Sequence, residues 1–191
     1  MEKEQFPVIE SERLILKPHL DNKEYAELLY NKIMDSKDHL FRFLPKLWKL
    51  KSVDDEMSFL THSKEEWEKK VTANYAIYLK STNEVVGTLG VMDISYDNDN
   101  AEIGYMLFKD HVHKGYMVEA VKAAESAFFK RGMNKIQIRM DVENTPSERV
   151  VLKCKYVYEG TQRNQEKNPS FGNTYRSLKV YTKLRSEWER E

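Results

Sequence analysis

The residues with the clearest chemical potential lie in a short loop that leads into a predicted helix. The loop reads Lys109-Asp-His-Val-His-Lys-Gly-Tyr116 and follows an apolar run. The first N–H groups of a helix have no partner inside the helix, and the helix dipole adds about half a positive charge there. Gly115 lets the backbone approach a ligand closely, and Lys114 adds a full charge. The loop is therefore a candidate anion site suited to a pyrophosphate, although it matches neither GxxxxGK[ST] nor GxGxxG.

Two other reactive residue types have simpler interpretations. His111 and His113 suggest a metal at first sight, but two histidines at i, i+2 without a nearby cysteine or carboxylate cluster are poor ligands. We therefore predict no metal and expect these rings to contact phosphate or solvent. Cys154 follows a predicted buried helix face at Val151, and no histidine lies close in sequence. A core thiol is predicted there rather than a nucleophile.

The elements that must position these groups follow from the hydrophobic periodicity. Helices are predicted from Asp21 to about residue 35, from Ser52 or Asp54 onward, from Gly115 to Lys130, and from Ser147 to Cys154. Strands are predicted at 13–17, 75–79, 85–94, 101–108, 135–140, 156–162 and 174–184, with the polar stretch 161–173 as a strand end that runs into a loop. The strands from 75 to 108 are close enough for an antiparallel meander, and strand–helix–strand order around the third helix implies a parallel pair. The prediction is an α+β or α/β domain with a mixed sheet of about seven strands and helices on both faces.

Composition and charge argue against some classes of function. The 191 residues suit one domain, 1–191, and carry 31 Lys plus Arg against 31 Asp plus Glu. The resulting net charge of zero gives no global basic field for nucleic acid or an anionic membrane. The N-terminus lacks the apolar core of a signal peptide, and no run approaches the roughly 20 apolar residues of a membrane span. We expect a cytoplasmic protein with neither a nucleic-acid nor a membrane partner.

Several motifs together resemble the GNAT acetyltransferases, most closely the branch of ribosomal-protein N-terminal acetyltransferases (RimJ/RimL type). The matching segments are Glu10-Ser-Glu-Arg-Leu-Ile-Leu-Lys17, Val85-Val-Gly-Thr-Leu-Gly90, Ala101-Glu-Ile-Gly-Tyr-Met-Leu107, His113-Lys-Gly-Tyr-Met-Val-Glu-Ala120, Asn144-Thr-Pro-Ser147 and Leu152-Lys-Cys-Lys-Tyr-Val-Tyr-Glu-Gly160. They cover about residues 9–184 in the order and spacing of the family. The resemblance implies a GNAT-like, mostly antiparallel sheet, acetyl-CoA as co-substrate, direct acetyl transfer to an amine, and a possible homodimer.

The resemblance also implies which residues hold the cofactor. The pyrophosphate motif of the family, Q/R-x-x-G-x-G/A, falls on Val112–Met117, where only Gly115 fits. His113 stands where many members have a second glycine, and Lys155-Tyr156 replaces a usual Gly-Phe. Backbone N–H groups do most of the pyrophosphate binding, so these side-chain changes need not abolish it. The predicted cofactor-binding residues are Met106, Leu107, Val112, His113, Lys114, Gly115, Tyr116, Met117, Asn144 and Lys153.

Acetyl transfer to an amine needs a neutral amine, a polarised carbonyl and a protonated leaving thiolate. Glu102 is predicted either to accept the amine proton or to order the water that does, although a solvated strand carboxylate is the simpler interpretation. Asn144 is a good N-cap, and the resemblance also places it among the site residues. Ser147 corresponds to the family serine that acts as general acid, so we predict a hydrogen bond from it to the leaving sulfur.

The sequence does not determine which amine accepts the acetyl group. The branch resemblance favours a peptide or protein N-terminus, and the alternative is a small amine such as a polyamine, an amino acid derivative or an antibiotic. A third class is a non-catalytic acyl-CoA-binding module. Four apolar residues, Phe41, Phe43, Leu47 and Trp48, lie in the segment that the family uses as one wall of the acceptor cleft. One or two of them are expected to line that cleft.

Overall fold

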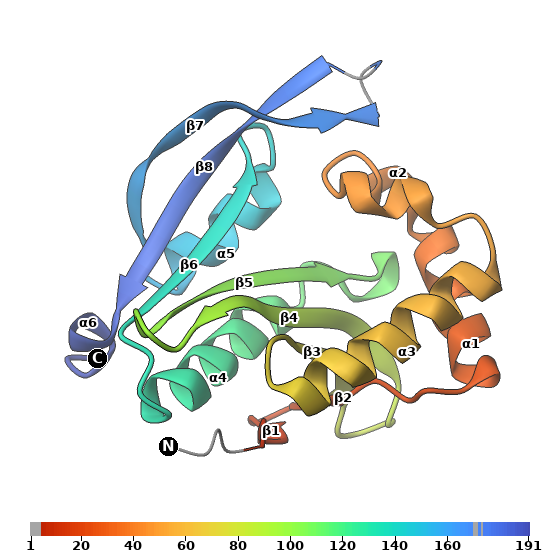
Figure 1. Cartoon of the computed structure of the whole chain (residues 1–191), viewed down its shortest axis with the longest axis horizontal. Coiled ribbons are helices and arrows are strands. Elements are labelled where there is room, and N and C mark those ends of the chain that lie inside the picture. Colours follow the sequence, from red (N-terminus) through yellow and green to blue (C-terminus); the bar gives the residue numbers. More distant parts are fainter. Residues whose placement is uncertain (1–4, 170–171, 173) are drawn as a thin grey trace.

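The computed structural model describes residues 5–169, 172 and 174–191, and a single mixed sheet organises them (Figure 1). Within these residues the sheet has eight strands in the order β1-β2-β3-β4-β5-β6-β8-β7. The strands are β1 Ile9–Glu10, β2 Leu14–Pro18, β3 Ala73–Leu79, β4 Val85–Ser95, β5 Asn100–Leu107, β6 Lys135–Asp141, β7 Val157–Asn168 and β8 Thr174–Leu184. Only β5 and β6 pair in parallel, while the other neighbours are antiparallel. The predicted mixed, mostly antiparallel fold is confirmed.

Helices cover both faces of this sheet, as predicted. They are α1 Lys23–Asp35, α2 Lys37–Leu40, α3 Val53–Lys69, α4 Tyr116–Lys130, α5 Thr145–Lys153 and α6 Arg185–Trp188, with short 3-10 turns η1 Pro45–Lys49 and η2 Lys109–His111. One apolar cluster packs α4 and α5 against the sheet through side chains such as Val121, Phe128 and Val151. A second cluster packs α1 and α3 on the other face, with Leu29 and Leu60. None of the described helices is long and apolar enough to cross a membrane.

The sheet splits after the first residues of β5, and this split positions the site. The parallel pairing of β5 with β6 covers only Asn100–Glu102 against Lys135–Gln137. Beyond it, β5 stays paired with β4 to Leu107, whereas β6 follows β8 as far as Asp141. The two strands therefore diverge, and none of the described strands pairs with this edge of β5 beyond Glu102. The start of α4 and the start of α5 face this opening (Figure 1).

Several boundaries differ from the predicted ones for local reasons. The first helix is capped by Asn22, whose side chain accepts from the Tyr25 N–H at 2.9 Å, and not by Asp21. Ser52 caps α3 in a reciprocal capping box with Asp55. The short strand β1 was not predicted, because two residues carry no readable alternation. The fourth predicted helix begins earlier, since Thr145 is already helical in α5.

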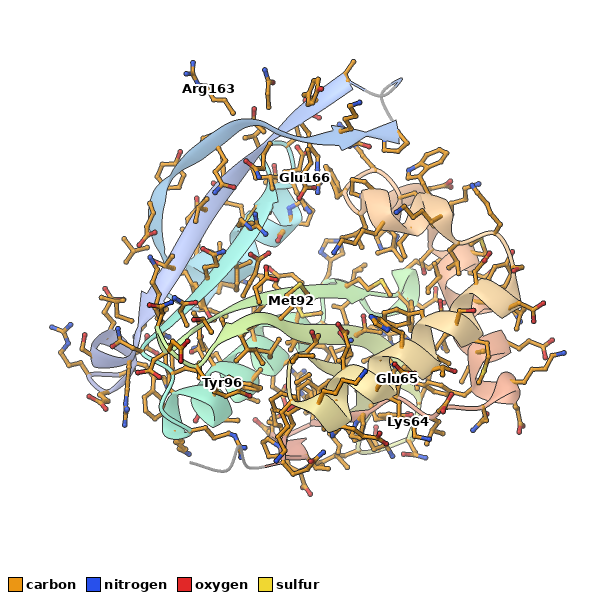
Figure 2. The ribbon with its side chains drawn as sticks, viewed as in Figure 1. Lys64, Glu65, Met92, Tyr96, Arg163 and Glu166 are labelled. Atoms are coloured by element: carbon orange, nitrogen blue, oxygen red, sulfur yellow. The ribbon has the colours of Figure 1, made fainter. Side chains whose placement is uncertain are left out.

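The largest boundary error concerns residues 161–173. Strand β7 continues to Asn168, while residues 170, 171 and 173 of the predicted loop lie outside the described residues. β7 is an edge strand with two register shifts against β8, and most of its side chains are exposed. Arg163, for example, points outward from it (Figure 2). A strand that buries neither face needs no apolar alternation, so its polar sequence was misread as a loop.

Candidate active site

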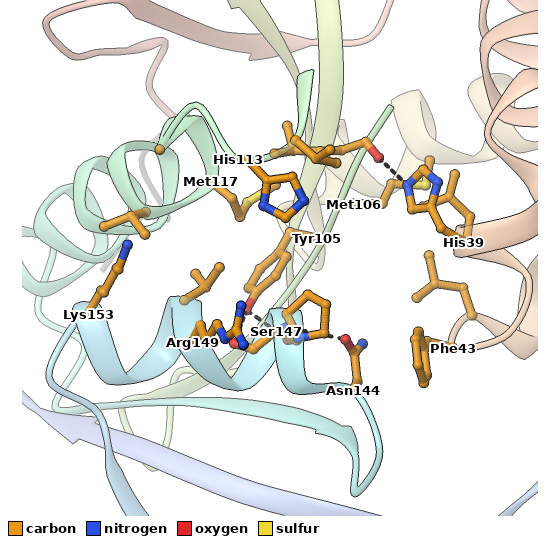
Figure 3. A pocket seen from close by; sticks show the side chains of 18 residues that line it. His39, Phe43, Tyr105, Met106, His113, Met117, Asn144, Ser147, Arg149 and Lys153 are labelled. Carbon is orange, nitrogen blue, oxygen red and sulfur yellow. Dashed lines mark hydrogen bonds between the residues drawn. The ribbon is translucent and has the colours of Figure 1, made fainter. Parts of the chain in front are cut away.

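A cavity of about 360 Å³ lies where the end of β5 meets the starts of α4 and α5 (Figure 3). This volume is in the range of about 300–1,000 Å³ that is usual for small-molecule sites. Its lining residues are His39, Leu40, Phe43, Leu44, Tyr105, Met106, Leu107, Val112, His113, Gly115, Met117, Val118, Asn144, Pro146, Ser147, Arg149, Val150 and Lys153. The cavity thus joins residues 39–44, the segment 105–118 and residues 144–153, which lie far apart in the sequence.

One end of the cavity is formed by the start of α4. Gly115 is the N-cap residue, with φ at 80°, and within the described residues no side chain caps this helix. The first bond of the helix runs from the Glu119 N–H to the Gly115 carbonyl at 3.1 Å. The N–H groups of residues 116–118 therefore precede the helical hydrogen-bond ladder. Because Gly115, Met117 and Val118 line the cavity, this end is suited to an anion.

At two positions where many family members have glycine, this chain has another residue, but the backbone keeps a conformation that favours glycine. His113 has φ at 62° and Lys155 has φ at 61°, both in the left-handed region. Such a conformation costs a non-glycine residue of order 1–3 kcal/mol, which the surrounding structure must offset. The loop and the turn after α5 therefore keep a glycine-like path despite the changed side chains.

The middle of the cavity carries a hydroxyl pair. Asn144 caps α5, because its Oδ1 accepts from the Ser147 N–H at 3.2 Å. The Ser147 Oγ lies 2.9 Å from the Tyr105 hydroxyl on β5. Burial raises the pKa of Tyr105 well above its ordinary value, so this phenol stays protonated near neutral pH. The phenol also lies 3.3 Å from the Ser147 carbonyl, and either hydroxyl of the pair can be the donor. When the phenol donates to the Ser147 Oγ, the serine proton is free for a group in the cavity.

The structure brings most of the predicted site residues to this cavity. Its lining includes Met106, Leu107, Val112, His113, Gly115, Met117, Asn144, Ser147 and Lys153. Lys114 and Tyr116 are not part of the lining. The Lys114 ammonium donates to the Asp110 carbonyl at 2.8 Å, and the Arg13 guanidinium lies 4.8 Å from the Tyr116 ring centre. Their part in cofactor binding remains a prediction.

Glu102 lies on the opposite face of β5 from Tyr105 and outside the cavity lining. Its Oε2 accepts from the Arg139 Nε at 2.6 Å and from the Gln137 Nε2 at 2.8 Å. The residue is 8% exposed, so it is not the solvated strand carboxylate of the simpler interpretation. The structure does not bring Glu102 to Ser147, and its role in proton transfer remains a prediction.

Sequence reasoning missed the part of the lining that α2 contributes. His39 lies at the cavity, and its Nε2 donates to the Leu107 carbonyl at 3.0 Å. A carbonyl only accepts, so the bond places the proton on Nε2 and the lone pair of the neutral ring on Nδ1. Of the four apolar residues predicted for the acceptor wall, Phe43 lines the cavity, whereas Phe41 is buried and Leu47 and Trp48 pack against the second apolar cluster.

Of the residues considered as metal ligands or as a nucleophile, His113 lines the cavity, whereas His111 and Cys154 do not. His111 is 6% exposed, and its Nε2 lies 3.3 Å from the Glu84 Oε1. Among the described residues no group of three or more histidine, cysteine, aspartate or glutamate side chains could hold a metal ion. The Cys154 thiol is fully buried, and burial raises its pKa to about 12. A thiol with that pKa is almost entirely protonated near neutral pH and is a poor nucleophile.

Removal of the Tyr105 hydroxyl tests the hydroxyl pair. We expect Tyr105→Phe to keep the ring packing and to lower kcat about tenfold, at the weak end of the effect of one hydrogen-bond donor, because Ser147 loses its partner. Steady-state kinetics would measure this, with Tyr158→Phe as a control on the exposed strand β7. An unchanged kcat in Tyr105→Phe would show that the pair has no part in turnover.

The comparisons with known proteins agree with this geometry. Residues 13–157 match the acetyltransferase (GNAT) domain family. This match spans most of the chain, and the chain therefore belongs to the GNAT acetyltransferase family. An uncharacterized N-acetyltransferase of Bacillus subtilis (strain 168), YoaA, is 27% identical over 178 residues, which are 91% of this chain and 98% of YoaA. The uncharacterized N-acetyltransferase p20 of Bacillus licheniformis is 38% identical over 94 residues. The match covers 49% of this chain, and it spans about half of p20 (53%).

Solved structures with the same fold include members of the predicted branch. The RimL ribosomal L7/L12 alpha-N-protein acetyltransferase in complex with coenzyme A has a TM-score of 0.83 at 21% identity, covering 95% of this chain and 98% of RimL. The microcin C7 self-immunity acetyltransferase MccE in complex with acetyl-CoA and AMP also has a TM-score of 0.83 at 21% identity, covering 91% of this chain and 93% of MccE. At this identity the likeness concerns the fold.

Proposed function

We propose that this chain transfers acetyl from acetyl-CoA directly to a primary amine, with a peptide or protein N-terminus as the acceptor. The cavity is the observation that best supports this proposal. It holds the unpaired N–H groups at the start of α4 and the Tyr105–Ser147 pair within one space. An anion-binding end and a proton-donating middle are what a phosphate-bearing thioester requires.

The residues present fit acetyl-CoA. The N–H groups of residues 116–118 suit the pyrophosphate, and Arg149 and Lys153 add positive charge from α5. The edge of β5 that β6 leaves unpaired, at Met106 and Leu107, suits an extended chain such as a pantetheine arm, although the Leu107 carbonyl already accepts from His39. We infer that the arm runs along this edge from the anion end toward Ser147.

Bound acetyl-CoA supplies a thioester carbon that the amine attacks, so that a C–N bond forms, the C–S bond breaks, the amine loses a proton and the thiolate gains one. Ser147 donates a hydrogen bond to the sulfur, and this bond strengthens as negative charge develops there. Tyr105 supports Ser147 from behind. Asn144 fixes the first turn of α5 and thereby the direction of the serine side chain.

The amine proton needs an acceptor at the cavity, and we propose His39 for this role ahead of Glu102. His39 lines the cavity with its Nε2 held by the Leu107 carbonyl, which leaves Nδ1 as the basic nitrogen. Histidine is the side chain that ordinarily exchanges a proton near neutral pH. Glu102 is held by Arg139 and Gln137 on the other face of β5.

A pH–rate comparison separates these two candidates. We expect His39→Gln to lower the rate at pH 7 and to recover partly at higher pH, where more of the amine is already neutral, since α-amino groups have a pKa near 8. Glu102→Gln should follow the wild-type profile more closely. The measurement is thiol release against pH for the three proteins. If only Glu102→Gln shows the loss and the recovery, the base is Glu102, and His39 has another role.

The charge of the lining supports the choice of acceptor. Among the residues that the structure describes, those that line the cavity include no aspartate or glutamate. A polyamine would be held best by carboxylates, so a polycation is disfavoured. The RimL neighbour is named as a protein acetyltransferase and acts on the ribosomal L7/L12 alpha-amino group. A small amine is the second candidate, because the MccE neighbour is a microcin immunity enzyme.

An acceptor panel tests the proposal. The purified chain is given acetyl-CoA with peptides of varied N-terminal residue, the same peptides with a blocked N-terminus, polyamines and aminoacyl compounds, and thiol release is followed together with product mass. Free-N-terminus peptides should react and blocked ones should not. Transfer to small amines alone would establish the second candidate. CoA binding without transfer to any acceptor would favour the acyl-CoA-binding module. A cytoplasmic location and a homodimer remain predictions.

A further inference from the structure

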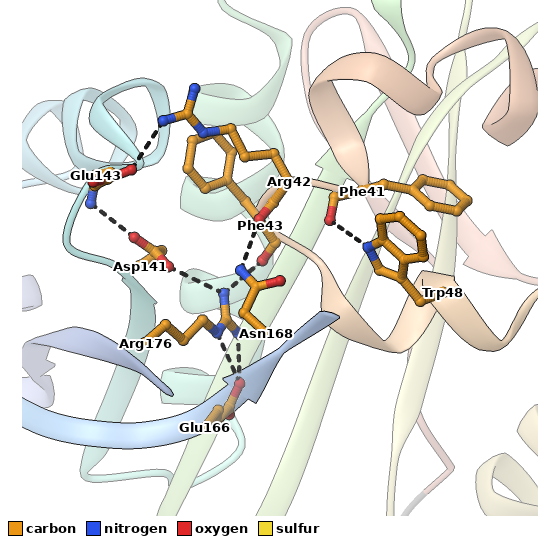
Figure 4. Close-up of polar contacts among 9 residues, drawn as sticks. All are labelled: Phe41, Arg42, Phe43, Trp48, Asp141, Glu143, Glu166, Asn168 and Arg176. Carbon is orange, nitrogen blue, oxygen red and sulfur yellow. Dashed lines mark hydrogen bonds and ion pairs between the residues drawn. The ribbon is translucent and has the colours of Figure 1, made fainter. Parts of the chain in front are cut away.

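A guanidinium outside the cavity joins three parts of the fold (Figure 4). Arg176 lies on β8 with its side chain 13% exposed. Its Nε and Nη2 donate to the Glu166 Oε2 at 3.1 and 2.5 Å, and its Nη1 donates to the Phe43 carbonyl at 2.8 Å. The same Nη1 lies 3.8 Å from the Asp141 Oδ2 at the end of β6. Arg176 therefore connects the β7–β8 pair, the turn after α2 and the segment that leads into α5.

Two further contacts strengthen the same connection. Asn168 on β7 is fully buried, and its Nδ2 donates to the Arg42 carbonyl at 3.1 Å. The Arg42 guanidinium in turn lies 2.9 Å from the Glu143 Oε2. Side chains of β7 and β8 thus bind two consecutive carbonyls, those of Arg42 and Phe43. The turn after α2 is held by these groups, although none of the strands in the described residues pairs with it.

Both ends of this connection reach the cavity. Phe43 is itself a lining residue, on the side that α2 forms. On the other side, the Asp141 Oδ1 accepts from the Glu143 N–H and the Asp141 carbonyl accepts from the Asn144 N–H, each at 2.9 Å. Asn144 then caps the turn that carries Ser147. A short chain of contacts runs from Arg176 through Asp141 and Asn144 to the serine.

We propose that Arg176 is a positioning residue that fixes the acceptor wall at Phe43 and the leaving-group donor at Ser147 relative to each other. Arg176 is not among the cavity-lining residues and acts through these two. The inference rests on the proposed function, since it assigns the two walls to the acceptor and to the leaving thiolate. A displacement of about 1 Å between reacting groups can cost about 100-fold in rate, so one guanidinium can control turnover from outside the cavity.

Arg176→Gln tests this role. We expect kcat to fall about 10- to 100-fold and the KM of the acceptor to rise, because both walls lose their common support. The affinity for acetyl-CoA should fall much less than kcat, since the start of α4 takes no part in the cluster. Arg176→Lys keeps the charge but lacks the planar fork, and it should recover part of kcat. Arg163→Gln, on the exposed side of β7, is the matched control and should behave as wild type. The acceptor is the peptide that wild type acetylates fastest.

A second variant tests the route to Ser147. Asp141→Asn keeps an oxygen for the Glu143 N–H but removes the charge that faces Arg176. If the route exists, the kcat losses of Arg176→Gln and Asp141→Asn combine to less than their product. Multiplicative losses, or a folded Arg176→Gln with wild-type kcat and acceptor KM, would overturn the proposal. A fall of acetyl-CoA affinity in step with kcat would overturn it as well.

Hydrogen exchange keeps the proposal testable without any acceptor. In Arg176→Gln the amides of residues 41–44, 143–145 and 147 should exchange faster, while those of α4 should not change. Uniform acceleration would mean general destabilisation and would contradict the proposal. A wild type that acetylates nothing in the panel would count against the proposed function alone, because the exchange pattern would still decide the role of Arg176.

Discussion

Gly115→Val should weaken the binding of acetyl-CoA by roughly 10- to 100-fold, the equivalent of about 1–3 kcal/mol of backbone strain. Gly115 caps α4 with φ at 80°, and a β-branched residue strongly disfavours that conformation. Space is not the obstacle, because an added Cβ would meet its nearest atom, the Arg13 Nη2, at an ordinary 3.5 Å. The loss is expected because the loop must change its path and so misdirect the first N–H groups of the helix.

Gly132→Val is the matched control for this experiment. Gly132 follows the other end of α4, has φ at 101°, and has nothing within 4 Å of an added Cβ. Gly132→Val therefore imposes similar backbone strain at a residue that does not line the cavity. Calorimetric titration of both variants with CoA, after thermal melts confirm folding, separates strain from binding. Equal affinity in the two folded variants would remove the start of α4 from the cofactor site.

Ser147→Ala should lower kcat by about 10- to 100-fold, toward the low end of what the loss of one preorganised donor costs. The KM for acetyl-CoA should change less, because the hydrogen bond matters most when sulfur carries charge. The serine is in place for this, since Asn144 fixes its backbone and Tyr105 its hydroxyl.

The control for Ser147→Ala lies in the same turn. Thr145→Ala changes an exposed residue of α5 that is not part of the cavity lining. Steady-state kinetics at saturating acceptor should show the loss only in Ser147→Ala. Full turnover in that variant would exclude Ser147 from the mechanism and would leave the protonation of the thiolate to water.

The sequence predicted those parts of the site whose residues lie close together in the chain. The strand–loop–glycine–helix order from β5 to α4 predicted an anion site that stays a prediction, and the Asn144–Ser147 spacing predicted the cap that the structure shows. The Tyr105–Ser147 contact joins residues 42 apart, so no local pattern encodes it. Alternation along a strand places Tyr105 and Glu102 on opposite faces of β5. It did not indicate which of the two faces the cavity.

The residues that were missed come from irregular or tertiary structure. His39 lies on a four-residue helix, where periodicity has too few residues to act on. Arg176 reads as one of several polar residues on a strand, and its importance follows only from the carbonyl and carboxylates that the fold brings to it. The polar strand β7 was misread for a related reason, because its stability derives from pairing with β8 rather than from burial.

A crystal structure of the chain with acetyl-CoA is the most direct test of the proposed position of the cofactor in the cavity. We expect the pyrophosphate at the N–H groups of residues 116–118, the pantetheine arm along the edge of β5 at Met106 and Leu107, and the thioester sulfur within hydrogen-bonding distance of the Ser147 Oγ. A cofactor bound outside this cavity, or one whose sulfur lies away from the Tyr105–Ser147 pair, would contradict it.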